Sequence, residues 1–188
     1  MAIRRRRNKS IDGTKRTYGR RLWVTGPSRS ATRGWLCLGV RVLPCALGRG
    51  GRSFRKREGD GATPSGVWEA VAVLYRADRV RRPRTGLPVR PLKPDDGWCD
   101  AVGDRNYNRA VRHPYPASAE RLWRQDSLYD VIVVLDHNRR PRVRGAGSAI
   151  FVHVAKPGYR PTEGCVALSR RDLLLVLAAG SGTRVVIA

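Results

Sequence analysis

Acidic residues are scarce in this chain. Its 188 residues include 15 Asp and Glu against 38 Lys and Arg, which gives a formal net charge of +23. Much of the excess lies early, because residues 1–57 hold 17 basic residues and one acidic residue, Asp12. A positive field of this size attracts polyanions of any kind, including nucleic acid, anionic lipid and anionic wall polymers. The charge therefore favours an anionic partner without identifying it.

A long apolar run is also missing from the sequence. No stretch approaches the roughly 20 apolar residues that span a bilayer, so we expect no transmembrane helix. The N-terminus, MAIRRRRNKSIDGTKRTYGRR, is basic but has neither the apolar core nor the cleavage site of a secretory signal peptide. As it stands it is not expected to direct secretion, so export would need another signal or another route, and without either the protein would stay in the cytoplasm.

Cysteine and histidine are few, at four and three residues. Cys37, Cys45, Cys99 and Cys165 form no C-x-x-C pair and no cluster with histidine at zinc spacing. We therefore expect no metal site and no cofactor. Cys37 and Cys45 lie in apolar runs, which favours small buried hydrophobic side chains over a disulfide.

The sequence does contain a β pattern. Residues 1–17 are basic, polar and without period, which predicts a disordered arm, and 18–188 are expected to form a single domain. Short apolar runs bounded by turn residues predict strands within 20–26, 34–48, 67–76, 129–138, 145–155 and 183–188. The proline-containing stretch 76–111 has few periodic positions and is expected to be a functional loop region.

Two segments have helical features. Ser118 is a candidate N-cap for a short helix over 118–126. Ser169, with Asp172 three residues later and a leucine-rich turn after it, predicts a capped helix that Gly180 closes. The fold class expected from these patterns is mainly β with one or two short helices.

One histidine and one cysteine stand out near the C-terminus. Alternation along 150–154 puts His153 on one strand face with Phe151, and Cys165 lies in a Glu-Gly-Cys turn shortly before the capped helix. A helix N-terminus and a nearby imidazolium can lower a thiol pKa, and a Gly-Cys turn can leave N–H groups for an oxyanion. A lone strand histidine and a lone cysteine are more often ordinary core residues, so spacing alone leaves both interpretations open. The order and distance of the two residues exclude papain-like enzymes and caspases.

Several blocks together resemble the L,D-transpeptidases (YkuD-type catalytic domains). GSAIFVH and TEGCVALS are similar to that family's catalytic motif, an upstream His followed by Ser or Thr, a variable residue, Gly and the nucleophilic Cys. The upstream blocks CALGRGG, KREGDGATPSGVW, WCD, YNR and LYDVIVVLDHN resemble, in order, a short proteobacterial branch of the family. The resemblance covers about Leu36 to Leu174 and implies a β-sandwich or barrel-like domain.

The resemblance also implies a catalytic set. Cys165 matches the nucleophile and His153 the base, while the backbone of Gly164 and Cys165 matches the oxyanion hole. Thr162 matches the hydroxyl position before the glycine. Two positions depart from the family pattern, because Glu163 and Ala167 stand where His and Arg or Asn are common.

The implied substrate is peptidoglycan. The Cys165 thiolate would attack a stem-peptide carbonyl, classically of diaminopimelate, and the thioester would pass to an amine of a second stem or to water. The family is generally sensitive to carbapenems. Because stem peptides carry carboxylates, cations are expected at the site. The candidate substrate contacts are Lys56, Arg57, Tyr107, Asn108, Arg109, Thr162, Glu163, Arg170 and Arg171, with Trp98 as a possible wall of the groove.

Several alternatives stay open at this stage. Hydrolysis by a carboxypeptidase or endopeptidase would use the same acyl-enzyme, and the crosslink formed could be 3-3, 1-3 or to a lipoprotein. A nucleic-acid-binding module fits the charge alone, but aromatic residues are only 7% and are not interleaved with the basic arm. The arm could still hold the protein on anionic polymers. The wall substrate implies a periplasmic location, and we expect a monomer.

Overall fold

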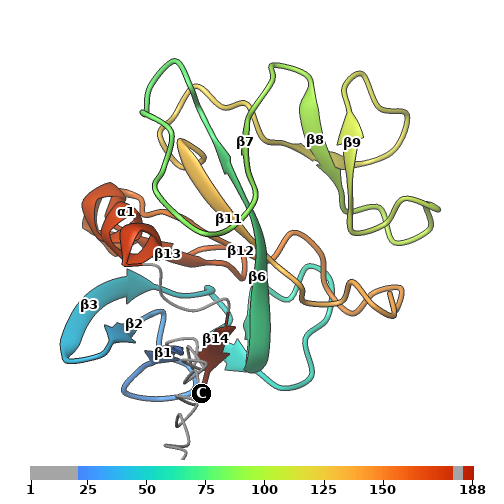
Figure 1. Ribbon diagram of the computed structural model, residues 1–188. Helices are drawn as coiled ribbons and strands as arrows, with labels where there is room; N and C mark the ends of the chain where they lie inside the picture. Colours follow the sequence, from blue (N-terminus) through green and yellow to red (C-terminus); the bar gives the residue numbers. More distant parts are fainter. Residues whose placement is uncertain (1–20, 180–183) are drawn as a thin grey trace, which may run out of the picture.

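The computed structural model describes residues 21–179 and 184–188 (Figure 1). The arm expected at 1–17 and the helix end expected at Gly180 lie outside these ranges. The largest sheet of the described chain contains β1 (Leu22–Thr25), β2 (Arg33–Leu38), β3 (Arg41–Ala46), β6 (Gly66–Tyr75), β7 (Val89–Pro91), β11 (Val131–Leu135), β12 (Phe151–Val154), β13 (Val166–Leu168) and β14 (Arg184–Ile187).

This sheet closes on itself. Its strands run in the order β11-β12-β13-β3-β2-β1-β14-β6, and β6 pairs in turn with β11 along Ala70–Tyr75. β7 adds to β6 outside the ring. Most neighbours are antiparallel, but β12 and β13 run parallel, as do β1 and β14, and β6 and β7. The expected mainly β, barrel-like domain is confirmed, and each of the six segments in which strands were expected contains at least one.

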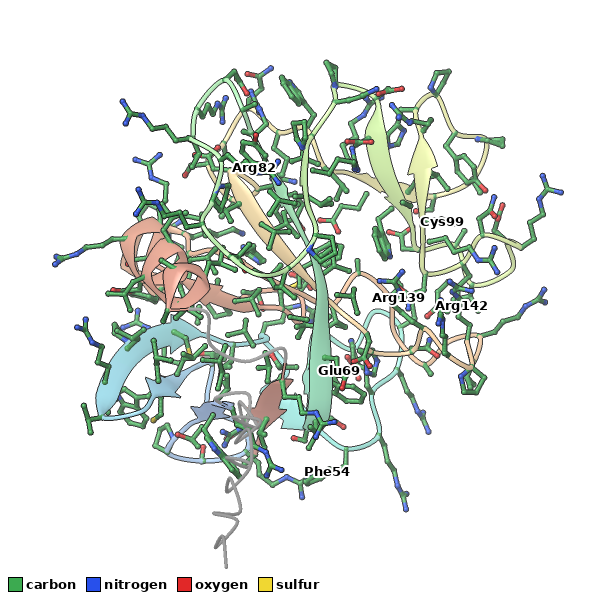
Figure 2. All side chains as sticks on the ribbon, viewed as in Figure 1. Phe54, Glu69, Arg82, Cys99, Arg139 and Arg142 are labelled. Carbon is green, nitrogen blue, oxygen red and sulfur yellow. The ribbon has the colours of Figure 1, made fainter. Side chains whose placement is uncertain are left out.

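A small sheet lies outside the barrel (Figure 1), and apolar side chains fill the space between it and the outer face of the barrel (Figure 2). It consists of β8 (Asp96–Cys99), β9 (Arg109–Arg112) and β10 (Ala119–Arg121), in the order β10-β8-β9. The helix expected over 118–126 is therefore wrong, because β10 pairs with β8 instead. The expected loop region 76–111 likewise contains three short strands, β7, β8 and most of β9. A third sheet pairs β4 (Arg52–Ser53) with β5 (Thr63–Pro64).

Strand alternation creates two apolar cores. Val152 and Val154 of β12 point into the barrel, where they join the core that α1 (Arg170–Ala178) also contacts. Phe151 points outward and packs under the small sheet, with Trp98 at 5.2 Å between ring centroids. The face assignment expected for 150–154 is confirmed, so the position of His153 on the outer face follows from the two-residue period.

Helix α1 begins as the sequence predicts. The Ser169 side chain accepts a hydrogen bond from the Asp172 N–H at 3.1 Å, and the Leu173 N–H bonds the Ser169 carbonyl. Within the described residues no helix is long and apolar enough to span a membrane. All four cysteines are free thiols; Cys45 is buried and Cys37 is half-buried.

Candidate functional site

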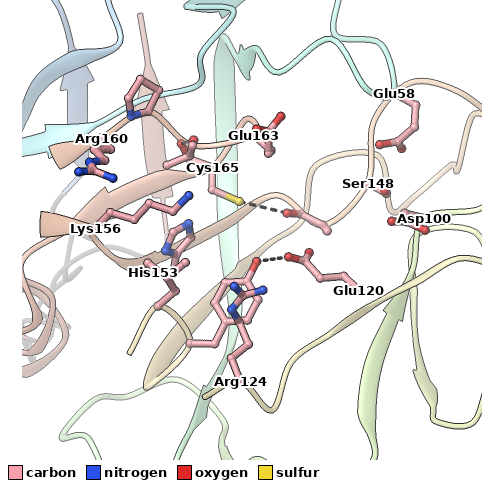
Figure 3. A pocket seen from close by; sticks show the side chains of 15 residues that line it. Glu58, Asp100, Glu120, Arg124, Ser148, His153, Lys156, Arg160, Glu163 and Cys165 are labelled. Atoms are coloured by element: carbon pink, nitrogen blue, oxygen red, sulfur yellow. Dashed lines mark hydrogen bonds between the residues drawn. The ribbon is translucent and has the colours of Figure 1, made fainter. Parts of the chain in front are cut away.

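A pocket of about 370 Å³ lies between the outer face of β12 and the small sheet (Figure 3). Cys165 and His153, which the sequence singles out, both line it. The remaining lining residues are Glu58, Asp100, Glu120, Arg124, Leu128, Tyr129, Ser148, Ala149, Lys156, Arg160, Pro161, Thr162 and Glu163. The fold thus brings the predicted pair to one cavity, together with many charged groups.

The turn before Cys165 requires glycine. Gly164 has φ +128°, a conformation that residues with side chains rarely adopt, and a Cβ there would lie 2.8 Å from the Ala62 carbonyl oxygen. Thr162 fastens the same turn, since its Oγ1 accepts the Gly164 N–H at 3.1 Å and donates to the Cys165 carbonyl at 2.7 Å. The hydroxyl of Thr162 therefore holds the backbone that presents the thiol.

Parallel pairing of β12 with β13 sets the position of the thiol. His153 lies opposite Ala167, so Cys165, just ahead of β13, falls beside Phe151. The Phe151 N–H donates to the Cys165 sulfur at 3.4 Å, and the thiol donates to the Ala149 carbonyl at 3.2 Å. Because His153 is two residues beyond Phe151, its side chain points to the same face as the sulfur (Figure 3).

His153 is held in one tautomer. Its Nδ1 lies 2.9 Å from the Val154 carbonyl oxygen, and since a carbonyl only accepts, Nδ1 carries the proton. Nε2 is then left as an unprotonated base. The ring packs edge-on against Tyr129, with 5.3 Å between centroids, and it is 6% exposed. The thiol proton is directed to Ala149, and no hydrogen bond joins the sulfur to the imidazole in the described structure.

Both members of the pair are neutral in the free protein. Burial raises the pKa of Cys165 to about 12; the negative charge of Glu120 adds to this, and the Phe151 N–H and Lys56 oppose it. Burial also lowers the pKa of His153 to about 4. The expected activation by the helix N-terminus does not operate, because β13 separates Cys165 from α1. The free site therefore holds a thiol and an imidazole, not an ion pair.

Three residues proposed as substrate contacts lie behind the pocket. Asn108, 2% exposed, accepts hydrogen bonds from the Trp98 indole at 2.9 Å and from the Ala149 N–H at 3.2 Å. Its amide therefore supports Ala149, whose carbonyl accepts the hydrogen bond from the thiol. Tyr107, 3% exposed, donates to Glu58 at 2.5 Å, so it orients a carboxylate that lines the pocket.

The proposed cations lie away from the pocket lining. The Lys56 side chain is 5% exposed and is ion-paired with Asp60, behind the Gly164 turn. Arg170 is exposed at the start of α1 and approaches Asp130 at 3.5 Å, and Arg171 is exposed on the same helix. Arg57 and Arg109 are also exposed at positions outside the lining. Of the two departures from the family pattern, Glu163 is exposed and ion-paired with Arg49 at 2.7 Å, whereas Ala167 is buried in β13.

Sequence reasoning missed most of the charged lining. Lys156 and Arg160 follow β12 closely, on the segment that includes the 3-10 turn Pro157–Tyr159, and only their closeness to His153 in sequence could have indicated them. Glu120 lies in the segment expected to be helical, so no local pattern placed it in the pocket. Tyr129 donates to Glu120 at 2.5 Å (Figure 3). Within the described chain, no group of three or more His, Cys, Asp or Glu side chains is arranged to hold a metal ion.

Comparisons with known proteins give one match. The family model of the L,D-transpeptidase catalytic domain (YkuD) matches residues 20–187, which include the whole barrel, the small sheet and the pocket. No curated protein matches the chain, and no solved structure does.

Proposed function

This chain belongs to the L,D-transpeptidase (YkuD) catalytic domain family, and on that premise we propose that it uses Cys165 as nucleophile and His153 as base to crosslink peptidoglycan stems. The family membership supports an L,D-transpeptidase-type enzyme that acts on the cell wall. The observation that carries the residue assignment is the shared pocket, in which the parallel strands β12 and β13 present the imidazole and the thiol to one cavity.

The first half-reaction forms a thioester. As a stem-peptide carbonyl of an L-centre approaches, the Cys165 thiol gives its proton to His153 Nε2 and the sulfur bonds the carbonyl carbon. Collapse of the tetrahedral intermediate breaks the C–N bond, and the leaving D-amino acid takes the proton from Nε2. Because Nδ1 is fixed on the Val154 carbonyl, Nε2 is the nitrogen that serves in both steps.

Backbone N–H groups of the Gly164–Cys165 turn stabilise the oxyanion in this proposal. The Gly164 N–H already donates to Thr162 Oγ1, so it can serve only by sharing or leaving that bond. The Cys165 N–H is therefore the primary donor. Thr162 holds the turn in place through its hydrogen bonds, and Glu163 lines the pocket beside the turn, where a substrate can contact it.

The second half-reaction consumes the thioester. A diaminopimelate amine of a second stem attacks, His153 removes its proton, and the C–S bond breaks to regenerate the thiol. His153 and Cys165 are only 6% and 8% exposed, so little water reaches the reacting atoms, which favours transfer over hydrolysis. Crosslinks between two diaminopimelates or to the first stem residue are both compatible with this sequence of steps.

Lys156 and Arg160 are the cations that we assign to substrate carboxylates. Both line the pocket and neither is ion-paired with an acidic residue in the described chain. We also propose a monomer, because all the groups used above come from one chain, and a periplasmic site of action, because the wall lies there. Non-specific contact with anionic polymers through residues 1–17 would hold the enzyme on its substrate.

Cys165→Ala tests the proposal directly. Incubation of the purified protein with sacculi, followed by muramidase digestion and mass spectrometry, should give new crosslinked muropeptides, and the variant should lower their yield by at least about a thousandfold. Cys37→Ala, which removes a thiol outside the pocket, is the matched control and should behave as the unmodified protein. Trimmed stems without crosslinks would identify a hydrolase instead, and product formation by Cys165→Ala would reject the nucleophile.

A further inference from the structure

The pocket is electrically divided. Lys156 and Arg160 lie on the side of the imidazole, whereas Glu58, Asp100 and Glu120 lie on the opposite side of the sulfur (Figure 3). One further cation of the lining, Arg124, lies over the ring of Tyr129. We call Glu58, Asp100 and Glu120 the acidic wall. They gather at one cavity in a protein that carries only 15 acidic residues and a net charge of +23. Scattered surface acids do not account for this convergence.

Within the described residues, the acidic wall lacks a salt-bridge partner. None of its three carboxylates is ion-paired with a basic residue that the structure describes, although most acids elsewhere in the described chain are. Burial raises the pKa of Glu120, the Tyr129 hydroxyl and the charge of Arg124 oppose this, and the charges of Asp100 and Glu58 raise the pKa further. Arg124 also lines the pocket and acts on Glu120, but its guanidinium is ion-paired with Asp126 at 2.6 Å. The like charges of the wall are therefore only partly compensated, which favours the binding of a further cation.

Two tyrosines fix the wall without neutralising it. Tyr129 donates to Glu120 and Tyr107 donates to Glu58, each at 2.5 Å. Asp100 follows β8, whose Trp98 pairs with Glu120 of β10, so the two acids come from neighbouring strands of the small sheet. A hydroxyl partner orients a carboxylate while leaving its charge, as a preorganised cation site requires.

Unsatisfied polar atoms mark the same wall. The hydroxyl of Ser148, a residue that lines the pocket and is 7% exposed, has the Tyr107 hydroxyl near it but makes no well-formed hydrogen bond. Asp100 Oδ1, which is also shielded from solvent, has no hydrogen-bond partner. Both residues line the pocket on the same side as Glu58 (Figure 3). Buried polar atoms without partners cost free energy, and this cost is removed when a ligand supplies the missing donors.

We propose that the acidic wall is a subsite for an ammonium group of the stem peptide. An ammonium carries three N–H donors and one positive charge, which match the carboxylates of Glu120 and Asp100 and the hydroxyl of Ser148. The basic side takes a carboxylate, so a zwitterionic group spans the sulfur with its two charges on opposite walls. This inference rests on the proposed function for the identity of the substrate and adds residues that recognise it.

Equilibrium binding tests the subsite without chemistry. In Cys165→Ala protein, titration calorimetry should show that a diaminopimelate-containing stem tripeptide binds at least about tenfold more tightly than the same peptide with its side-chain amine acetylated. Adding Glu120→Gln or Asp100→Asn should reduce that ratio to about threefold or less. Glu69→Gln is the matched control, because it removes the same charge from an exposed pair with Arg184 and should keep the full ratio.

Kinetics then separate the two possible sources of the ammonium. If it belongs to the donor stem, amine acetylation and Glu120→Gln should each slow formation of the acyl-enzyme, followed by intact mass. If it belongs to the acceptor, acylation should be unchanged and the ratio of transfer to hydrolysis should fall. Either result supports the subsite. Should Glu120→Gln fail to fold, Asp100→Asn carries the test, because no side-chain hydrogen bond of Asp100 is lost.

Different experimental results would contradict the ammonium subsite and the proposed function. An unmodified protein that never forms an acyl-enzyme would reject the function, while the calorimetric ratio would still be readable. Equal binding of free and acetylated peptides, or a ratio that survives both Glu120→Gln and Asp100→Asn, would overturn the ammonium subsite even if crosslinking is observed.

Discussion

Cys165 and His153 form a neutral acid–base pair in the free protein. The thiol donates to the Ala149 carbonyl, which requires that its proton be present, and burial sets the pKa values of the two groups on opposite sides of neutrality, about 12 and about 4. The sequence motif alone suggested a thiolate held by an imidazolium. The geometry instead favours proton transfer that is coupled to attack on the substrate.

Alkylation kinetics of Cys165 follow from this protonation state. Because the thiolate is the reactive form, the rate with iodoacetamide should be low at pH 7 and should rise about tenfold per pH unit through pH 9 and beyond. Peptide mapping by mass spectrometry in a Cys37→Ala background would isolate the modification at Cys165. A rate that is flat from pH 6 to pH 9 would indicate a preformed ion pair and contradict the neutral state.

At the scale of elements, the crossover between β12 and β13 supplies the basic side of the pocket. Two parallel strands cannot be joined by a tight hairpin, so residues 155–165 must return along the barrel before β13 begins. This path carries Lys156 and Arg160 past the cavity. Helix α1 comes only after β13 and packs on the barrel core. Arg170 and Arg171 at its start therefore do not line the pocket.

Arginine and lysine substitutions test whether the substrate carboxylates bind to the β12–β13 connection or to the start of α1. Lys156→Ala and Arg160→Ala should each raise KM for a stem peptide by about tenfold, because each removes an unpaired cation from the pocket. Arg170→Ala and Arg171→Ala remove the same charge from α1 and should change KM by less than about twofold. Steady-state kinetics on folded variants would decide, and the opposite ranking would return the substrate contacts to the helix start.

The sequence predicted correctly those features that depend on interactions between residues close together in the chain. The alternation around Phe151 and His153 and the cap at Ser169 are set by neighbours within a few residues, and both are confirmed. The helix predicted around Glu120 is wrong, because strand pairing with Trp98, more than twenty residues earlier, overrides a weak N-cap signal at Ser118. The acidic wall could not be predicted from local sequence patterns for the same reason, because its three residues come from segments that are distant in the sequence.

For the molecule as a whole, buried neutral groups couple stability to pH. The pKa of His153 in the folded state is about 4, below the ordinary value of 6.5, so the folded protein binds fewer protons than the unfolded chain between these values. Its contribution to stability is present above pH 6.5 and is lost as the pH falls toward 4. Burial also lowers the pKa of His137, so this residue contributes to the pH dependence of stability with the same sign as His153. The buried thiols of Cys165 and Cys45, with pKa values raised to about 12, lose their contribution as the pH rises above 9.

Urea unfolding measures the histidine contribution. Between pH 7 and pH 5 the free energy of unfolding of the unmodified protein should fall, with about 2 kcal/mol of the loss due to His153. In His153→Gln the fall should be smaller by about that amount, whatever the absolute stability of the variant. The comparison is made between two pH values within each protein, so a general destabilisation does not affect it. An identical fall in both proteins would show that His153 is not buried in neutral form.

The suppressed acidity of Cys165 also affects how long the enzyme survives. Peroxide and other oxidants attack thiolates, and repeated oxidation beyond sulfenic acid is irreversible. A sulfur that stays protonated, sheltered at 8% exposure and tied to the Ala149 carbonyl, presents almost no thiolate to such agents between turnovers. In the proposed mechanism, nucleophilicity then arises only while substrate occupies the cavity, so an enzyme that acts on the cell wall can rest in an oxidising medium without losing its proposed nucleophile.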